Sequence, residues 1–172
     1  MKREVMEWME TLVWATVAVV LLFTFVARTA VVSGDSMNPT YHDGDRMIIS
    51  ALGFKPSYGD VVVFAEADGS EENLIKRVIA TEGQTIDIDY DSGKVTVDGT
   101  VLDEPYIAEP TNEKGADKLP ATVPAGHVFV MGDNRNHSRD SRFTSVGMVD
   151  TRLILGRAWW QFFPFDKLGF IG

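Results

Sequence analysis

Apolar residues form one long run near the start of the chain. Residues 12–26 (LVWATVAVVLLFTFV) contain no charged side chain and show no polar face at helical spacing, unlike most helices that pack on a protein core. Extended by a few residues at each end, the run reaches about the 20 residues that a helix needs to span a bilayer. The pattern predicts a transmembrane anchor at residues 11–31, after a short N-terminus at residues 1–10.

A cleaved signal peptide is the alternative for this run. Such a peptide begins with net positive charge and ends at small residues spaced for cleavage. Here Lys2 and Arg3 are offset by three glutamates, and the residues two positions before Ala27 and Ala30 are not small. We therefore expect a retained anchor in the cell membrane. The basic pair at the start favours a cytoplasmic N-terminus and an extracytoplasmic domain.

Short apolar runs alternate with turn residues in the rest of the chain, as in β proteins. The predicted strands are residues 46–50, 60–64, 74–80, 85–90, 94–97 and 127–131. Asp91-Ser92-Gly93 is typical of a hairpin turn, and no long helical period follows the anchor. We expect a mainly β fold, a mostly antiparallel and barrel-like domain over residues 32–172, tethered by one N-terminal transmembrane helix.

Composition and charge restrict the possible partners. The chain has 172 residues and a formal net charge of −9, which argues against nucleic acid as the main partner. It has no cysteine, which excludes disulfides, thiolate metal sites and cysteine nucleophiles. The spaced Asp87, Asp89 and Asp91 resemble a calcium loop, but the glycine falls one place late, at Gly93, and the segment alternates as a strand does. We expect no metal and no cofactor.

Two residues far apart in the sequence can together supply nucleophilic chemistry. Ser36 lies in the polar stretch 33–40 (SGDSMNPT), and its hydroxyl needs a nearby base to react at neutral pH. Lys76 lies within an apolar β pattern, and burial can lower a lysine pKa by roughly 3–5 units, enough to make it a base. Its neighbour Arg77 points to the opposite face of the strand and stays charged. The alternatives are an ordinary turn serine and an edge-strand lysine that opposes aggregation.

A polar loop follows the last of the predicted strands. Residues 132–142 (GDNRNHSRDSR) are rich in hydrogen-bonding side chains, and loops held on rigid sheets often carry function. Ser138 is able to hydrogen-bond a lysine amine and orient it. Asp140 and Arg142 are able to pair and hold the loop. A solvated loop would be the default interpretation of this segment alone.

Taken together, these segments resemble the type I signal peptidases. The matching segments are Ser36-Met37-x-Pro39-Thr40 (the nucleophile box), 59–64 (GDVVVF), Lys76-Arg77-Val78 (the lysine box), 132–142 (the most recognisable signature) and Gly156-Arg157-Ala158 with the aromatic tail after it. They follow the family's order and cover nearly the whole chain. Because the segment between the lysine box and the signature is short, the chain resembles the compact Gram-positive form.

The resemblance implies a serine endopeptidase that removes signal peptides from exported precursors at the outer membrane surface. The implied partners are precursors with small residues at positions −1 and −3 before the cut, together with the lipid bilayer. Ser36 would be the nucleophile and Lys76 the general base. Gly34, Ser36 and Met37 would contact the substrate or the oxyanion, although Gly34 replaces a hydroxyl residue that donates a second bond in some members. The supporting residues would be Ser138, Asp140 and Arg142.

Other functions are compatible with parts of the sequence. A Ser-His-Asp hydrolase would use His42, His127 or His137, but no G-x-S-x-G turn is present. Self-cleaving repressors share the Ser–Lys pair but carry a DNA-binding domain, where this chain has an apolar run. A membrane-tethered β module that binds exported proteins without cutting them is the remaining alternative. The presence of both Ser36 and Lys76 argues against it.

Overall fold

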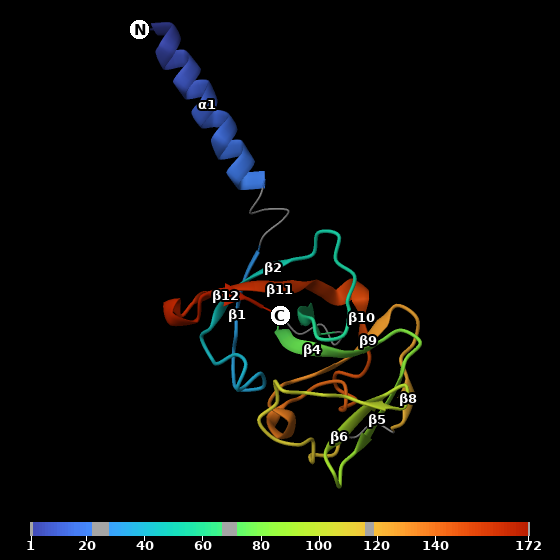
Figure 1. The fold of residues 1–172 in the computed structure, drawn as a ribbon. Helices are drawn as coiled ribbons and strands as arrows, with labels where there is room; N and C mark the ends of the chain where they lie inside the picture. The colour runs from blue at the N-terminus through green and yellow to red at the C-terminus, as the bar shows by residue number, and fades with distance from the viewer. Residues whose placement is uncertain (1, 22–27, 67–71, 116–118, 172) are drawn as a thin grey trace.

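The computed structural model describes residues 2–21, 28–66, 72–115 and 119–171, which form one helix and a β body (Figure 1). The helix is α1 (Lys2–Leu21). The strands are β1 (Arg28–Val31), β2 (Arg46–Ser50), β3 (Val61–Ala65), β4 (Asn73–Thr81), β5 (Thr85–Asp89), β6 (Lys94–Val97), β7 (Thr100–Val101), β8 (Ala121–Thr122), β9 (His127–Met131), β10 (Val149–Asp150), β11 (Ile154–Phe163) and β12 (Gly169–Phe170). The short 3-10 helices among the described residues are η2 (Arg135–His137), η3 (Thr151–Leu153) and η4 (Phe165–Lys167).

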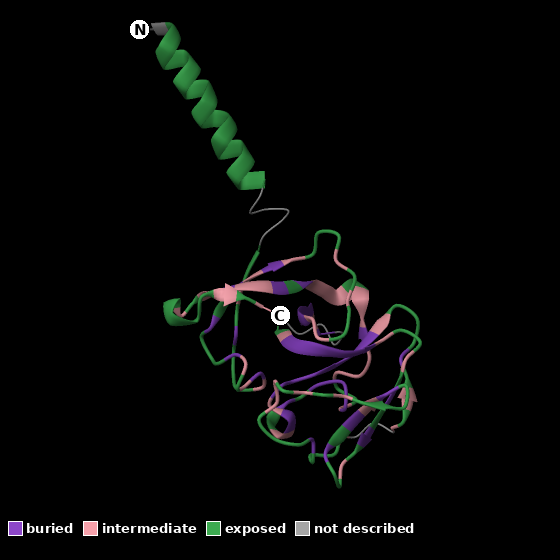
Figure 2. Ribbon diagram, in the orientation of Figure 1, coloured by how far each residue is buried: buried purple, intermediate pink, exposed green. Residues whose placement is uncertain are grey.

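Helix α1 projects from the β body, and its described side chains are exposed along its whole length (Figure 2). No helix among the described residues combines the length and the apolar character needed to cross a membrane. Part of the predicted anchor, residues 22–27, lies outside the described residues. The last part of that prediction, Arg28–Val31, forms β1 and pairs with β2, so the chain enters the sheet earlier than the expected boundary.

The larger sheet is antiparallel and carries the strands in the order β1-β2-β11-β3-β4-β9-β10, with β12 paired to β11. Over the described residues, β1 pairs only with β2 and β10 only with β9, so the sheet stays open. The expectation of a mainly β, mostly antiparallel domain is confirmed. The barrel-like form is wrong, because the chain builds two open sheets and not one closed sheet.

The second sheet is smaller, with the order β7-β6-β5-β8. Its strand β5 alternates as the sequence predicts, with Ile86 and Ile88 buried and the aspartates exposed. These isoleucines pack with Phe129 and Met131 of β9 in one apolar cluster. Hydrophobic burial therefore joins the second sheet to the far halves of β4 and β9. The predicted turn at residues 91–93 joins β5 to β6, and Gly93 adopts a φ of +72° there.

Strand β11 is not among the strands predicted from the sequence, although it is the longest described strand and lies between β2 and β3. Register shifts interrupt its pairing with both neighbours, and each shift breaks the alternation by which strands are recognised. Gly156 is required within it, because a Cβ at this position would come within 2.9 Å of the Ser50 backbone. Most of the aromatic residues after Ala158, which the sequence suggests as a tail, lie in the second half of this strand.

Candidate active site

The structure brings Ser36 and Lys76 into direct contact. Ser36 lies in the turn that follows β1 and is half-buried, whereas Lys76 lies on β4 and is only 2% exposed. The Lys76 Nζ donates to Ser36 Oγ at 2.7 Å and to the Ile75 carbonyl at 2.9 Å. Once the amine is neutral, the short contact can reverse, with the hydroxyl donating its proton to nitrogen. That is the geometry required of a nucleophile and its base.

Burial lowers the pKa of Lys76 from 10.5 to about 8. The nearby Asp140 carboxylate opposes this effect and the Arg139 guanidinium adds to it, while Glu66 and Asp133 act as Asp140 does. A pKa near 8 leaves roughly one amine in ten neutral at pH 7, against fewer than one in a thousand for an ordinary lysine. The site therefore holds a base that is available near neutral pH.

The backbone around Ser36 is fixed by the loop 132–142. Asn134 donates its amide N–H to the Ser36 carbonyl at 3.1 Å and its side-chain amide to the Asp35 carbonyl at 3.0 Å. Gly132 packs directly against the Ser36 carbonyl, and any Cβ at position 132 would collide with that carbonyl. Within the described residues the Ser36 amide N–H makes no hydrogen bond, so it is free to donate to an oxyanion.

The other residues expected at the oxyanion occupy different surroundings. Gly34 is exposed and adopts a φ of +81°, with open space where a side chain would begin. Its N–H donates to Asp43 Oδ1 at 2.8 Å, so this donor is already engaged. Met37 is fully buried in the apolar cluster beneath β1 and β2. Of the three, only the Gly34 N–H is engaged, whereas the Ser36 and Met37 N–H groups make no hydrogen bond among the described residues.

Asp140 and Arg142 pair as predicted, and both are completely buried. The guanidinium donates to both carboxylate oxygens, at 2.8 and 2.9 Å, and also to the Arg135 carbonyl at 2.6 Å. The same carboxylate accepts the Gly132 N–H at 3.0 Å. A buried pair with this many hydrogen bonds fixes the shape of the loop. Among the described residues it makes no hydrogen bond to the Lys76 amine.

Ser138 lies beside the Asp140–Arg142 pair, and its carbonyl accepts a hydrogen bond from Arg142 Nη2 at 3.3 Å. Its side chain is buried, and its Oγ has no hydrogen-bond partner among the described residues. A Cβ on Gly132 would collide with both this Oγ and the Ser36 carbonyl, so the hydroxyl borders the turn that holds Ser36. Its predicted contact with the Lys76 amine is not formed here and stays a prediction. A buried hydroxyl without a partner is costly, which is consistent with a partner during reaction.

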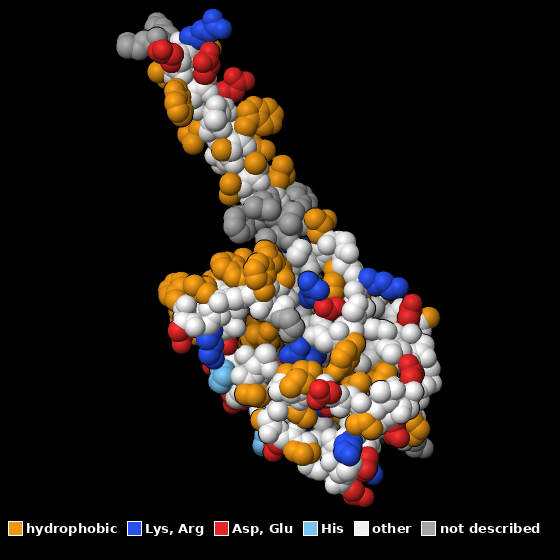
Figure 3. Space-filling model, viewed as in Figure 1, with side chains coloured by type: hydrophobic (Ala, Val, Ile, Leu, Met, Phe, Trp, Pro, Cys, Tyr) orange, Lys and Arg blue, Asp and Glu red, His pale blue; other side chains and the backbone are white. Residues whose placement is uncertain are grey.

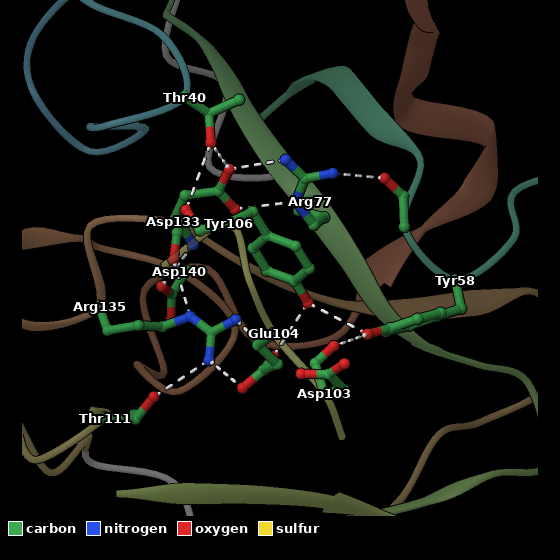
Figure 4. Close-up of polar contacts among 12 residues, drawn as sticks. Thr40, Tyr58, Arg77, Asp103, Glu104, Tyr106, Thr111, Asp133, Arg135 and Asp140 are labelled. Carbon is green, nitrogen blue, oxygen red and sulfur yellow. Dashed lines mark hydrogen bonds and ion pairs between the residues drawn. The ribbon is translucent and has the colours of Figure 1, made fainter. Parts of the chain in front are cut away.

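Asp133 connects the two halves of the site, a role that the sequence analysis did not assign (Figure 4). Its carboxylate accepts two hydrogen bonds from Arg77, at 2.9 and 2.7 Å, and one from Thr40 Oγ1 at 2.6 Å. Arg77 follows Lys76 on β4, and Thr40 follows Ser36 in the turn. Arg77 points to the opposite face of β4 from Lys76 but is buried as well, since it is only 3% exposed.

A groove lies between β1 and the start of β4, where both strands have an unpaired edge over the described residues. Strand β4 pairs with β9 only from Arg77 onward. Over the described residues, the corresponding edge of residues 73–76 is therefore unpaired. Strand β1 pairs only with β2 over the described residues, so its other edge is unpaired as well. A cavity of about 260 Å³ lies between these segments, lined by Ala30, Ile49, Val63, Ile75, Leu155 and their neighbours. An extended peptide is able to fill such a space by adding a strand.

The histidines have other surroundings. The ring of His42 contacts Lys167 Nζ at 3.1 Å, and His127 contacts the Ala125 carbonyl at 2.9 Å. His137 is exposed in η2. Within the described residues none of the three hydrogen-bonds to Ser36, so a Ser-His-Asp arrangement finds no support there.

Comparisons of the sequence and of the structure with known proteins point to one family. Residues 5–163 match the family model described as signal peptidase, peptidase S26. The chain is 40% identical to the probable signal peptidase I-1 of Synechocystis sp. over 92% of this chain and 82% of the relative. It is 34% identical to signal peptidase I of Bacillus licheniformis over 97% and 93%. A crystal structure of a signal peptidase I from Enterococcus faecalis matches with a TM-score of 0.50 at 28% identity, over 60% of this chain and 97% of that one.

Proposed function

Because this chain belongs to the S26 family of signal peptidases, and is thus a serine endopeptidase that removes signal peptides from precursor proteins, we propose that Ser36 and Lys76 carry the reaction. The observation that supports this assignment most strongly is the 2.7 Å contact between Lys76 Nζ and Ser36 Oγ. The lysine is almost fully buried, and its pKa is lowered to about 8. Serine and its base are therefore within hydrogen-bonding distance before any substrate binds.

In the proposed mechanism, Lys76 takes the Ser36 hydroxyl proton while Oγ attacks the scissile carbonyl carbon. The Ser36 N–H then stabilises the oxyanion of the tetrahedral intermediate. When the intermediate collapses, the C–N bond breaks and Lys76 returns its proton to the leaving amine. Lys76 next takes a proton from water, which attacks the acyl-enzyme ester, and the proton passes back to Ser36. Ser138 would accept a hydrogen bond from the lysine amine when it is charged.

The groove between β1 and β4 is the proposed binding site for the end of the signal peptide. Main-chain hydrogen bonds to the two free edges would hold an extended peptide there. The cavity there measures about 260 Å³ and its lining is mostly apolar, so it would favour small side chains at positions −1 and −3 of the precursor. Shallow apolar pockets exclude larger side chains because overpacking forces strained rotamers.

We also propose that the N-terminal segment anchors the protein in the cell membrane, with residues 32–172 outside the cytoplasm. The uncharged run 12–26 and the exposed apolar side chains of α1 support this. Figure 3 shows apolar side chains gathered on the side of the β body from which α1 projects. Phe165 and Phe170 are 75% and 83% exposed, as expected of residues that meet lipid.

The proposed substrate preference is tested with the full chain in detergent micelles and two synthetic precursors. One carries Ala at positions −1 and −3, and the other carries Phe at −1. We expect cleavage of the first after the −1 alanine, identified by mass spectrometry, and cleavage of the second to be about tenfold to hundredfold slower, since overpacking costs about 1–3 kcal/mol. Binding of the alanine precursor without any shortened product would instead support the non-catalytic module.

A further inference from the structure

Tyr106 covers the buried arginine that follows the proposed base. It comes from the segment after β7, outside the sequence motifs that suggested the site. The Arg77 guanidinium lies 4.2 Å from the centre of the Tyr106 ring, and the Arg135 guanidinium lies 5.9 Å from it. Figure 4 shows the ring beside the Arg77 side chain, with the guanidinium joined to the Asp133 carboxylate by dashed lines. Both distances fall within the range of cation–π attraction.

The position of the ring is fixed by its own polar contacts. The Tyr106 hydroxyl donates to Glu104 Oε1 at 3.0 Å and lies 3.3 Å from the Tyr58 hydroxyl. Glu104 in turn accepts two hydrogen bonds from Arg135, at 2.9 and 2.7 Å. Burial and the contact with Tyr58 raise the pKa of Tyr106, so the phenol stays neutral. The segment 104–106 is therefore held rigidly over the arginine.

The covered ion pair is the connection between the two reactive side chains. Burial by itself would lower the pKa of Arg77, but the hydrogen bonds and the negative charge of Asp133, together with Tyr106 and Tyr41, outweigh this effect and raise it. The same carboxylate binds Thr40 in the turn of Ser36. Water that reached Arg77 would compete for Asp133, because a buried ion pair depends on good geometry and on exclusion of solvent. A looser Arg77 would shift Lys76, the residue next to it on β4.

We propose that Tyr106 is a positioning residue for catalysis, whose ring shields the Arg77–Asp133 ion pair and thereby keeps Lys76 within reach of Ser36. This inference rests on the roles proposed above for Ser36 and Lys76. The ring touches neither of these residues and lies away from the groove between β1 and β4. Its effect should therefore fall on the chemical step and leave substrate binding unchanged.

The test compares Tyr106→Leu, which removes the ring, with Tyr106→Phe, which keeps the ring and loses only the hydroxyl. We expect Tyr106→Leu to lower kcat about tenfold to thirtyfold, the factor for loss of a desolvated cation–π contact, with KM unchanged within about twofold. Tyr106→Phe should keep kcat within about twofold of the original. The matched control is Tyr90→Leu. Tyr90 is an aromatic residue after β5 whose ring lies near Lys114 and not over Arg77, so this variant should leave kcat unchanged.

A double-mutant cycle separates this role from a general structural one. In an Arg77→Lys background, Tyr106→Leu should lower kcat by no more than about twofold, because the planar guanidinium that the ring covers is gone. Equal losses in both backgrounds, an unchanged kcat in Tyr106→Leu, or an equal loss in Tyr106→Phe would each overturn the proposal. So would an unfolded Tyr106→Leu chain, which would make Tyr106 a residue of the folding core.

The proposed function is tested separately by Ser36→Ala and Lys76→Met. If these two variants still process precursors at the original rate, the assignment of the catalytic pair fails, whatever Tyr106 does. If both are inactive and Tyr106→Leu keeps its kcat, the inference on Tyr106 alone fails.

Discussion

Replacing Ser36 with alanine is expected to abolish processing of a signal-peptide precursor while the fold is kept. The substitution removes the oxygen that attacks the scissile carbonyl, and loss of a catalytic serine lowers kcat by about 10⁶-fold in well-studied hydrolases. The backbone contacts of the turn do not depend on the hydroxyl, since Asn134 binds the Ser36 carbonyl. The measurement is single-turnover cleavage of a precursor with Ala at −1 and −3, followed by mass spectrometry.

The matched control for this variant is Ser33→Ala. Ser33 lies in the same polar stretch and is exposed. We expect it to process the precursor at the original rate. Both variants should unfold at nearly the same denaturant concentration as the original chain. Processing by Ser36→Ala at a rate close to the original would exclude Ser36 as the nucleophile.

Replacing Lys76 with methionine is expected to lower kcat by about 10²–10⁴-fold, the usual contribution of a general base. Methionine fills similar space but accepts no proton. Arginine should be equally inactive, because its guanidinium stays charged at any working pH. The control is Lys94→Met, at the exposed start of β6, which should not change the rate. Activity in Lys76→Arg near the original level would contradict the role of Lys76.

The same methionine variant should be more stable than the original chain at pH 7. The pKa of Lys76 falls from 10.5 in an ordinary setting to about 8 when folded, and this difference corresponds to about 3 kcal/mol at 1.36 kcal/mol per pKa unit. Below pH 8 the amine is charged in both states, and the full cost of its burial opposes folding. Between pH 8 and 10.5 the unfolded chain binds more protons, so the stability of the original chain rises with pH. Denaturant unfolding at pH 7 and pH 10.5 should show the gap between the two proteins closing.

The predicted strands were found because their side chains alternate between a buried and a wet face, as Ile86 and Ile88 do on β5. The same signal was weaker in β11, where register shifts reverse the alternation and Gly156 interrupts the apolar pattern. The barrel-like expectation was wrong because pairing between strands distant in sequence decides whether a sheet closes. Local pattern does not carry that information.

The reactive pair could be proposed because its chemistry demands particular residue types, and the resemblance to a family placed Ser36 and Lys76 in the right order. The hydrogen-bond network around this pair could not be predicted from the sequence. Asp133 joins Arg77 and Thr40, residues that lie 56 and 93 positions away from it, and only the folded structure brings these side chains together. Tyr106 carries no motif, and an isolated tyrosine in a polar loop gives no sign of the guanidinium that it covers.

The central claim is that the Lys76 amine loses its proton near neutral pH because it is buried beside Ser36. The most direct measurement is an NMR titration of the lysine amines, in which the signal of Lys76 is assigned by its absence from the Lys76→Arg variant. We expect this signal to titrate with a pKa of about 8, and the acidic limb of kcat/KM to follow it. A Lys76 amine that stays charged up to its usual value of 10.5 would contradict the account.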